Sequence, residues 1–437
     1  MDIIRWIRGV LYVVKIDIYA EYISALRNSW QDIQKKNLTY ILQYAKKNCS
    51  YYNNILPDKI SRTNCIDILN SLPIVNKQII REQKTSFYSR EISDNWSSWA
   101  NTGGSTGEPF RFPSLMKGNL EGLCQRLLYK RMGSRGGLFD LIISVDGTRI
   151  EDSQRDRNVF WKKNLLSFPY GKYSLSTIYM SPLTLPYYIS FLNEKKPSIL
   201  RGYPSGILEI ARYIKENKVE LSFALKGVYL TSESFDKSTE FYISDVFSCP
   251  VYGQYGHTEA SIFAIKKPEQ DDYLTFPLYG YTEILDDFGN HVKQGESGRI
   301  VVTGFSHYGT PFIRYETGDL AIYGGTLEDG SVVLTSLLGR TVDYIVNSNK
   351  EKIFLIGFIF GGHLRAFNYI KKWQIEQKVE GHILLRIVKG EGYDNSIENE
   401  VIELFASKGI SVEIQYVEMI SRTSRGKEKF IIQNLVN

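Results

Sequence analysis

Residues 198–231, SILRGYPSGILEIARYIKENKVELSFALKGVYLT, decide the fold class of this chain. The runs 198–203 and 225–231 are short and rich in β-favouring residues, and between them about 205–216 has the apolar spacing of a helix. A strand, a helix and a second strand in this order are typical of a parallel sheet covered by helices. The run 139–145, FDLIISV, predicts a further strand of the same kind. We therefore predict an α/β fold built on a parallel sheet.

The patterns change on both sides of this core. Upstream, residues 20–85 have helical apolar spacing that is broken at Pro73, so we predict an N-terminal helical segment over about 1–95. Downstream, the segment 281–334 alternates between apolar and polar residues in short runs that Gly and Asp turns separate. This pattern predicts a β-rich subdomain.

A third change of pattern follows Arg340. The remaining chain contains a strand-like run, HILLRIV at 382–388, a helical segment near 395–407 and a final strand-like run, VEIQYVEMI. These elements predict a small α+β domain. We place it at 341–437, after a large N-terminal domain at 1–340.

The composition describes an ordinary globular protein. Of the 437 residues, 43% are apolar and 23% are charged, and the formal net charge of +5 comes from scattered lysines and arginines. We therefore expect no nucleic-acid partner. The four cysteines, at positions 49, 65, 124 and 249, show no C-x-x-C spacing, so we predict reduced thiols in the cytoplasm.

The first 20 residues are apolar in character, but Arg5, Arg8 and Lys15 interrupt them and no small-residue cleavage site follows. The chain has no run of about 18 uninterrupted apolar residues, so we predict neither a signal peptide nor a membrane span. Two interpretations of this segment remain. One is a helix docked on the protein, which we favour, and the other is an amphipathic helix on a membrane surface.

A glycine-rich segment, NTGGSTGEPF at 101–110, carries the first candidate chemistry. Its glycines let backbone N–H groups converge and its hydroxyls add donors, which suits a polyphosphate. The G-x-x-x-x-G-K-[ST] spacing of a P-loop is absent, and Glu108 follows the last glycine. By itself, the segment is equally typical of a flexible turn.

Two later segments add an aromatic ring and two carboxylates. In VYGQYGHTEA at 251–260, Tyr255 is suited to stack on a nucleobase and Glu259 is a hard oxygen ligand for Mg²⁺ bridged by phosphates. In IRYETGDLA, Arg314 and Asp319 lie around a Thr-Gly turn, and Asp319 is suited to a ribose diol. Each segment alone also fits an ordinary glycine-rich turn, in which an aspartate caps its own backbone.

The order of these segments resembles that of the adenylate-forming (AMP-forming) ligases. The chain is most similar to phenylacetate-CoA ligases and to their CapK-like relatives of capsular polysaccharide biosynthesis, nearly from end to end. This resemblance implies a large α/β domain, a small mobile C-terminal domain, ATP and Mg²⁺, with coenzyme A as one possible acceptor. The matching segments are the loop at 102–109, YGHTE at 255–259, TGD at 317–319, GRTVD at 339–343 and RTSRGK at 422–427.

The resemblance also implies a role for each matching residue. Lys427 would be the mobile catalytic lysine, and Glu259 would hold Mg²⁺. Asp319 would bind the ribose hydroxyls, Tyr255 would pack on the base, and Arg340 would contact the nucleotide. The remaining ATP or AMP contacts would be Thr102, Ser105, Thr106 and Gly107 at the phosphates, with Ser232 and Glu233 beside the adenine.

The acid pocket and one departure from the family complete this set. Tyr203, Pro204, Ser205 and His257 are candidates to line the pocket for the acid. Many of these ligases carry lysine after the Thr-Gly pair of the loop, whereas this chain has Glu108. We leave Glu108 out of the site, because a carboxylate beside phosphates would repel them.

A ligase that activates a small carboxylic acid as an acyl-adenylate is the function that these features favour. The acceptor is either coenzyme A, as for an aryl-acid CoA ligase, or a sugar or amine in surface (capsular or O-antigen) polysaccharide biosynthesis, which we favour. A second hypothesis is an inactive nucleotide-binding scaffold in a biosynthetic complex. The presence of Glu259, Asp319, Arg340 and Lys427 together argues against that scaffold. A kinase or P-loop NTPase is disfavoured because the GK[ST] motif is absent.

Overall fold

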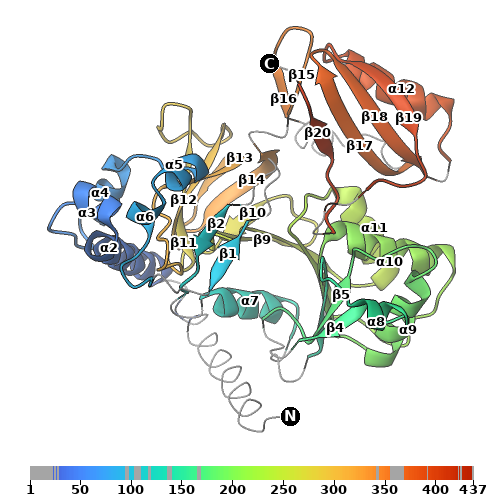
Figure 1. The fold of residues 1–437 in the computed structure, drawn as a ribbon, viewed down its shortest axis with the longest axis horizontal. Coiled ribbons are helices and arrows are strands. Elements are labelled where there is room, and N and C mark those ends of the chain that lie inside the picture. The colour runs from blue at the N-terminus through green and yellow to red at the C-terminus, as the bar shows by residue number, and fades with distance from the viewer. Residues whose placement is uncertain are drawn as a thin grey trace.

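The computed structural model describes residues 23, 26, 29–93, 98–102, 110–116, 120–134, 140–164, 169–340, 344–354, 369–390, 392–421, 423 and 426–435. These residues form three regions: a group of N-terminal helices, a central mixed sheet with its covering helices, and a smaller C-terminal unit (Figure 1). The predictions for residues 1–22 and for the loop positions Ser105, Thr106, Gly107 and Glu108 lie outside the described residues. No helix of the described part is long and apolar enough to cross a membrane.

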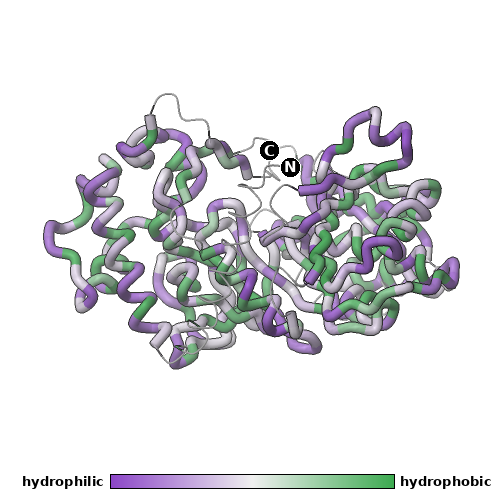
Figure 2. The backbone as a smooth tube through the Cα atoms, turned by 90° about the horizontal axis from the view of Figure 1, so that it is seen from below, coloured by the Kyte–Doolittle hydropathy of each residue, from purple (hydrophilic) through white to green (hydrophobic). Residues whose placement is uncertain are grey.

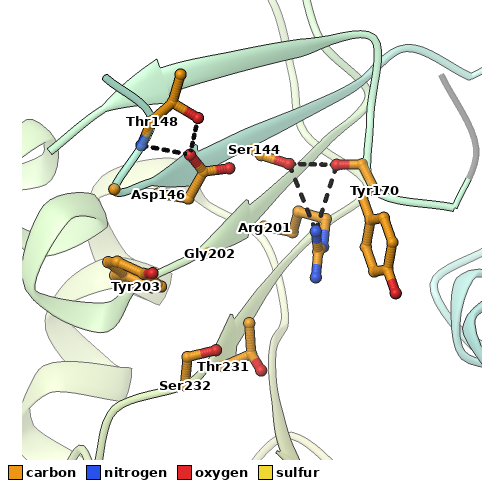
Figure 3. Close-up of a pocket in the computed structure, with 10 residues that line it drawn as sticks. Ser144, Asp146, Thr148, Tyr170, Arg201, Gly202, Tyr203, Thr231 and Ser232 are labelled. Atoms are coloured by element: carbon orange, nitrogen blue, oxygen red, sulfur yellow. Dashed lines mark hydrogen bonds between the residues drawn. The ribbon is translucent and has the colours of Figure 1, made fainter. Parts of the chain in front are cut away.

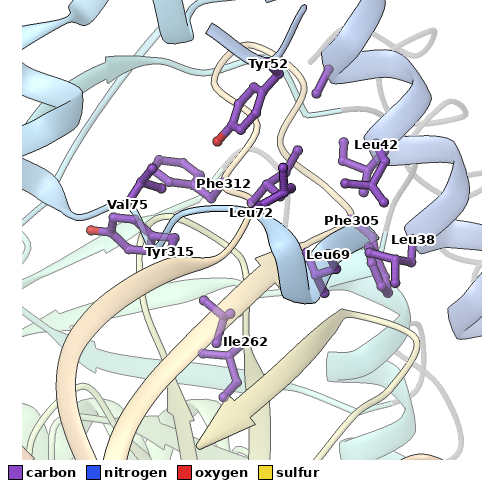
Figure 4. Packing of buried hydrophobic residues seen from close by; sticks show 14 of the residues in the cluster. Leu38, Leu42, Tyr52, Leu69, Leu72, Val75, Ile262, Phe305, Phe312 and Tyr315 are labelled. Carbon is purple, nitrogen blue, oxygen red and sulfur yellow. The ribbon is translucent and has the colours of Figure 1, made fainter. Parts of the chain in front are cut away.

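The N-terminal helices pack on the antiparallel end of the central sheet. Leu38, Ile41 and Leu42 lie on one face of the first long helix and are fully buried, as the apolar spacing predicted. They share a hydrophobic cluster with Phe305 and Phe312 (Figure 4). The helices are α2 (Trp30–Asn48), α3 (Ser50–Ile55), α4 (Cys65–Ser71), α5 (Lys77–Glu82) and α6 (Lys84–Phe87).

The central sheet has twelve strands in the order β11-β12-β13-β14-β10-β9-β8-β7-β6-β3-β5-β4. Strands β5, β3, β6, β7 and β8 are parallel neighbours, which confirms the predicted parallel sheet. The predicted β-rich segment is present and continues this sheet through antiparallel strands. The first six strands are β3 (Ile142–Asp146), β4 (Trp161–Lys163), β5 (Tyr173–Ser176), β6 (Ile199–Gly202), β7 (Gly227–Thr231) and β8 (Val251–Gly256). The others are β9 (Phe263–Lys266), β10 (Tyr273–Thr275), β11 (Gly280–Leu285), β12 (Ser297–Gly304), β13 (Tyr315–Thr326) and β14 (Val332–Arg340).

Helices cover both faces of the parallel strands. Alternate residues such as Ile199 and Tyr229 face α7 (Leu120–Arg131), whereas Leu200 and Val228 face the opposite helices. In Figure 2 the helices at both ends of the molecule alternate between hydrophilic and hydrophobic residues, as expected for helices with one buried face. The helices beside the parallel strands are α8 (Asp152–Arg155), α9 (Leu185–Lys195), α10 (Pro204–Glu216) and α11 (Lys237–Phe247). Outside the central sheet, β1 (Trp99–Asn101) pairs with β2 (Arg111–Pro113) in an antiparallel pair.

The C-terminal unit is a four-stranded sheet, in the order β19-β18-β17-β20, with one helix on it. Its helix α12 buries Ile397, Val401 and Phe405 in a cluster of residues that come from this unit only. The predicted strands and helix of this region are present, and β17 and β20 are additions that the pattern did not reveal. The elements are β15 (Tyr344–Val346), β16 (Lys352–Phe354), β17 (Ile370–Val379), β18 (His382–Lys389), α12 (Asn395–Ala406), β19 (Ser411–Tyr416) and β20 (Ile431–Gln433).

Candidate active site

A pocket lies at the carboxyl ends of three neighbouring parallel strands, β3, β6 and β7 (Figure 3). This strand-end pocket has a volume of about 450 Å³, and Asp146, Arg201, Tyr203 and Ser232 are among its lining residues. The carboxyl edge of a parallel sheet is a common ligand site, because the strands end there in loops whose side chains converge. Gly202 ends β6 with a φ of 142°, and a Cβ there would lie 1.9 Å from a β3 carbonyl oxygen, so glycine is required.

The C-terminal unit brings Lys427 to the edge of this pocket. Lys427 Nζ donates to the Ser232 carbonyl oxygen at 3.0 Å, across 195 positions of sequence, and lies 5.2 Å from the centre of the Tyr203 ring. The Thr177 hydroxyl donates to the Gly426 carbonyl oxygen at 3.0 Å. A Cβ at Gly426 would come within 2.3 Å of Thr177 Oγ1, so glycine permits this close approach. The structure thus places Lys427 beside two residues that line the pocket.

Glu233 joins the large domain to the C-terminal unit. Its carboxylate accepts hydrogen bonds from the Ser205 amide at 3.0 Å, the Ser205 hydroxyl at 3.2 Å and the Glu428 amide at 3.0 Å. Burial raises the pKa of Glu233, and the hydrogen bonds from Ser205 oppose that rise. Pro204 and Ser205 begin α10 and, with Glu233, line a larger interdomain groove rather than the strand-end pocket. The adenine contact of Ser232 and Glu233 stays a prediction.

Ion pairs cross the interdomain groove. Lys371 Nζ lies 2.8 Å from Glu216, and Lys372 Nζ lies 2.8 Å from Glu209 and 3.0 Å from Glu428. The two lysines belong to β17, whereas Glu209 and Glu216 belong to α10. Figure 1 shows the C-terminal unit next to α10 and α11, with the segment before β20 reaching toward them. These contacts hold the unit in the position that places Lys427 at the pocket.

Glu259 is a buried carboxylate enclosed by donors and cations. It is 2% exposed, and its Oε1 accepts a hydrogen bond from the Tyr315 hydroxyl at 2.8 Å. Lys77 Nζ lies 3.6 Å from Oε1, and His257 Nδ1 lies 3.2 Å from Oε2. Burial alone would raise the pKa of Glu259, but His257, Lys77 and Tyr315 outweigh it and hold the pKa well below its usual range. The carboxylate therefore stays ionised. His257 lies here, outside the lining of the strand-end pocket.

Lys77 is a site residue to which the sequence reasoning gave no role. Only the structure shows where this lysine lies. Val75 pairs with Tyr315 at the start of β13, and the Asn76 side chain caps α5 by accepting from the Ile79 amide at 3.0 Å. These two local interactions place Lys77, the first residue of α5, beside Glu259.

Asp319 is held by two other predicted site residues. The Tyr255 hydroxyl donates to Asp319 Oδ2 at 2.7 Å, and Arg340 Nε lies 3.6 Å from Asp319 Oδ1. Strands β13 and β14 place Asp319 opposite Arg340 in register. Burial raises the pKa of Tyr255 well above its usual value, so its phenol remains a donor. The structure therefore joins Tyr255, Asp319 and Arg340 in one group, and their contacts to a nucleotide stay predictions.

Several buried polar atoms in this part of the large domain have no hydrogen-bond partner among the described residues. They are Thr102 Oγ1, Ser306 Oγ, His307 Nδ1 and His257 Nε2. Burial lowers the pKa of His307 to about 4, so its ring is neutral near pH 7. Unpaired buried groups indicate a position that a ligand or ordered water completes. One ionised carboxylate near such groups fits Mg²⁺ bound through phosphates, since Mg²⁺ commonly takes one or two carboxylates together with phosphate oxygens.

Sequence comparisons show that the chain is similar to CapK proteins. Residues 345–434 match the CapK C-terminal domain. Protein CapK of Staphylococcus aureus is 25% identical over 435 residues, a match that covers 95% of this chain and 92% of that protein. The similarity thus includes both domains.

Structural comparisons give the same fold. A 2-hydroxyisobutyryl-CoA ligase in the postadenylation state, in complex with R3-HIB-AMP, has a TM-score of 0.68 and 19% identity, and the match covers 92% of this chain and 88% of that one. The acyl acid amido synthetase GH3.15 has a TM-score of 0.57 and 15% identity, with 92% of this chain and 89% of that one covered.

Two states of the same ligase differ in their similarity to this chain. In its open conformation, in complex with 2-HIB-AMP and CoA, the 2-hydroxyisobutyryl-CoA ligase has a TM-score of 0.55 and 19% identity, with 91% of this chain and 90% of that one covered. The postadenylation state has the higher TM-score, 0.68. The chain therefore carries a CapK C-terminal domain and has the fold of the adenylate-forming ligases, as its motifs indicated.

Proposed function

We propose that the protein is an ATP-dependent, AMP-forming carboxylic-acid ligase that works in the cytoplasm. The observation that carries this proposal is the position of Lys427. A lysine from the C-terminal unit reaches the pocket at the strand ends of the large domain, where an acid and a nucleotide phosphate would meet. The fold that the chain shares with acyl-adenylate-forming ligases supports the same reaction.

The reaction joins two anions, so its barrier is electrostatic. A carboxylate oxygen of the acid forms a bond to the α-phosphorus of ATP, the bond from that phosphorus to the bridging oxygen breaks, and pyrophosphate leaves with the electron pair. The Lys427 ammonium stabilises charge that develops on the α-phosphate, because a fixed cation in a site that excludes water acts more strongly than one in solution. The ionised Glu259 would hold Mg²⁺, which supplies charge neutralisation to the phosphates.

The nucleotide would lie along the groups already described. Asp319 binds the ribose hydroxyls, while Tyr255 and Arg340 hold its carboxylate in place. Thr102 and the glycine-rich loop bind the phosphates, and Lys77 adds a cation beside Glu259. Ser232 and Glu233 contact the adenine, on the side where Lys427 enters.

The acceptor in this proposal is a sugar or amine of surface polysaccharide biosynthesis. The similarity to Protein CapK along most of the chain supports that context. Coenzyme A is the alternative acceptor, since one structural relative is a CoA ligase. The two acceptors share the first half-reaction, so the adenylation step can be tested without choosing between them.

Pyrophosphate release tests the proposal directly. The purified protein is given ATP, Mg²⁺ and, in turn, aryl, fatty, hydroxy, amino and dicarboxylic acids, with no acceptor. We expect release that depends on one class of acid and on Mg²⁺. Release of ADP instead of pyrophosphate would contradict a ligase of this type, and ATP binding without turnover over the whole panel would favour the scaffold.

A further inference from the structure

Arg201 is a cation inside the strand-end pocket that the proposed reaction does not use. It lies near the end of β6, in a row across the sheet with Ser144 of β3 and Tyr229 of β7. Its Nε donates to the Tyr229 hydroxyl at 2.9 Å, and its Nη1 donates to the Tyr170 carbonyl oxygen at 3.3 Å. The rings of Tyr170 and Tyr229 lie 5.0 and 4.9 Å from the guanidinium carbon. The charge is thus enclosed by tyrosines.

The groups around Arg201 solvate it without neutralising it. Its acceptors among the described residues are the Tyr229 phenol, the Tyr170 carbonyl and the Ser144 hydroxyl, all of them neutral. Burial raises the pKa values of both tyrosines, which keeps them protonated. Asp146 also lines the pocket, where its Oδ1 accepts from the amide and hydroxyl of Thr148 in its own turn, so its negative charge is held at the end of β3 and forms no ion pair with Arg201. Arginine remains charged at any ordinary pH, so the pocket wall is cationic at this point.

The position of Arg201 relative to Lys427 defines the ligand. Figure 3 shows the guanidinium beside Ser144 and Tyr170, with its other terminal nitrogen directed away from them. Lys427 approaches from the side of Tyr203 and Ser232, which line another part of the same pocket. A ligand in the pocket therefore meets Arg201 in the pocket wall and Lys427 beside the lining residues Tyr203 and Ser232. A partly desolvated arginine without an anionic partner is costly unless the ligand supplies the anion.

We propose that the acid activated here is a small dicarboxylic acid, whose reacting carboxylate lies toward Lys427 and whose second carboxylate pairs with Arg201. This inference rests on the proposed ligase function. A guanidinium edge matches a carboxylate in geometry as well as in charge. The volume of about 450 Å³ suits a small ligand. A fatty or simple aryl acid would instead place apolar atoms against the arginine and leave its charge unpaired.

Chain-matched acids test this inference in the pyrophosphate assay. Succinate is compared with butyrate, and glutarate with valerate, so that each pair differs only in the second carboxylate. We expect kcat/KM to be about 100-fold or more higher for the better dicarboxylate than for its partner, because a polar group built to bind a substrate group strongly rejects the analogue that lacks it. Arg201→Met should remove this preference by raising KM for the dicarboxylate, while turnover of the monocarboxylate persists. Arg201→Lys should retain part of the preference.

The control is Arg157→Met, which removes an exposed arginine outside the pocket and should leave the preference unchanged. If monocarboxylates are used as well as dicarboxylates, or if Arg201→Met keeps the preference, the inference is wrong while the ligase function stands. If no acid yields pyrophosphate although ATP binds, the ligase proposal fails and the inference fails with it. If Arg201→Met does not fold, the inference is tested by the preference for dicarboxylates over monocarboxylates in the unaltered protein and in Arg201→Lys.

Discussion

Glu259 and Arg201 are both charged groups inside the large domain, but the protein treats them differently. Glu259 is surrounded by Lys77, His257 and Tyr315, which hold it in the ionised form. Arg201 donates only to a phenol, a hydroxyl and a backbone carbonyl, so no carboxylate of the described residues pairs with it directly, and Glu121 is linked to it only through Tyr229 and Gln125. The difference teaches that groups of the protein itself keep Glu259 ionised, whereas Arg201 has only neutral acceptors and can pair with an anion that a ligand brings.

The ion pair between Arg314 and Glu283 is an example of a buried charge that another residue of the protein balances, away from the candidate site. Arg314 Nη2 lies 3.2 Å from Glu283, and Arg314 Nη1 also donates to the Asn70 and Leu72 carbonyl oxygens. Its side chain is 9% exposed and that of Glu283 is 0% exposed. This pair ties the N-terminal helices to β11 and β13, away from the strand-end pocket. The motif that contains Arg314 and Asp319 thus serves two purposes, one structural and one at the site.

The largest expected effect is a loss of reaction rate when Lys427 is removed, in contrast to a change in KM when Arg201 is removed. Lys427→Ala should lower the rate of acid-dependent pyrophosphate release about 1,000-fold, because it removes charge stabilisation in the transition state, and should leave ATP affinity largely intact. Arg201→Met should act on KM for the acid instead. Lys350→Ala, an exposed lysine of the same unit, is the matched control and should change the rate less than twofold, on the order of the usual surface effect. An unchanged rate in Lys427→Ala would remove this lysine from the chemistry.

The next effect concerns stability and tests whether Arg201 is truly uncompensated. Arg314→Met should lower the free energy of unfolding by about 3 to 5 kcal/mol, because it leaves Glu283 buried without its partner. Arg201→Met should change it by less than about 1 kcal/mol or increase it, since no buried carboxylate of the described residues loses a partner. Urea denaturation measures both. A loss in Arg201→Met as large as that in Arg314→Met would mean that Arg201 is part of the structural core.

Acid titration tests the contrast between Glu259 and Arg201 by changing the protonation state of Glu259. Because the folded-state pKa of Glu259 is lowered, its contribution to stability is present above the ordinary value of 4.5 and is lost as the pH falls below it. Between pH 7 and pH 3 the free energy of unfolding of the unaltered protein should fall by about 2 kcal/mol more than that of Glu259→Gln. Burial raises the pKa of Glu283, so protonation of Glu283 favours the folded state as the pH falls. Glu283→Gln should therefore not reduce the loss of stability in acid. Equal acid sensitivity of the protein and Glu259→Gln would contradict the ionised, compensated state.

The smallest effects belong to the Asp319 group. Asp319→Ala should raise the apparent KM for ATP about tenfold, because the ribose loses its acceptor. Tyr255→Phe should raise it only about threefold, since the phenol acts by orienting Asp319. Initial rates of pyrophosphate release at varied ATP give both KM values, and isothermal titration with ATP gives the matching affinities. Wild-type affinity in Asp319→Ala would show that the ribose binds elsewhere.

Much of the fold could be predicted from local patterns. The strands at 198–203 and 225–231, the helix between them and the helical N-terminal segment were recognisable because periodicity depends only on neighbouring residues. Strands β17 and β20 were not recognised. Three-residue β20 has almost no pattern of its own and becomes a strand through its parallel pairing with β17. The sequence also suggested two kinds of sheet, whereas backbone pairing joins β9, β10 and β14 into one continuous sheet.

The candidate site, like the fold, could be predicted from the sequence only in part. Motif order marked Lys427, Glu259, Asp319, Tyr255 and Arg340, and the structure brings Tyr255, Asp319 and Arg340 into contact. Pro204 and Ser205 line the interdomain groove and His257 lies beside Glu259, and their contact with the acid stays a prediction. Tyr203, which directly precedes Pro204, lines the strand-end pocket.

The sequence by itself determined most of the element types, the order of the motifs and the identity of the charged residues available for chemistry. Only the tertiary structure decided which of those charges are paired. Lys77 meets Glu259, and Ser232 meets Lys427, through contacts between segments that are remote in the chain. Arg201 has no such charged partner among the described residues, and that too became visible only when β3, β6 and β7 were aligned. Helix and strand patterns are short-range, whereas compensation of a buried charge depends on every atom that folding brings around it.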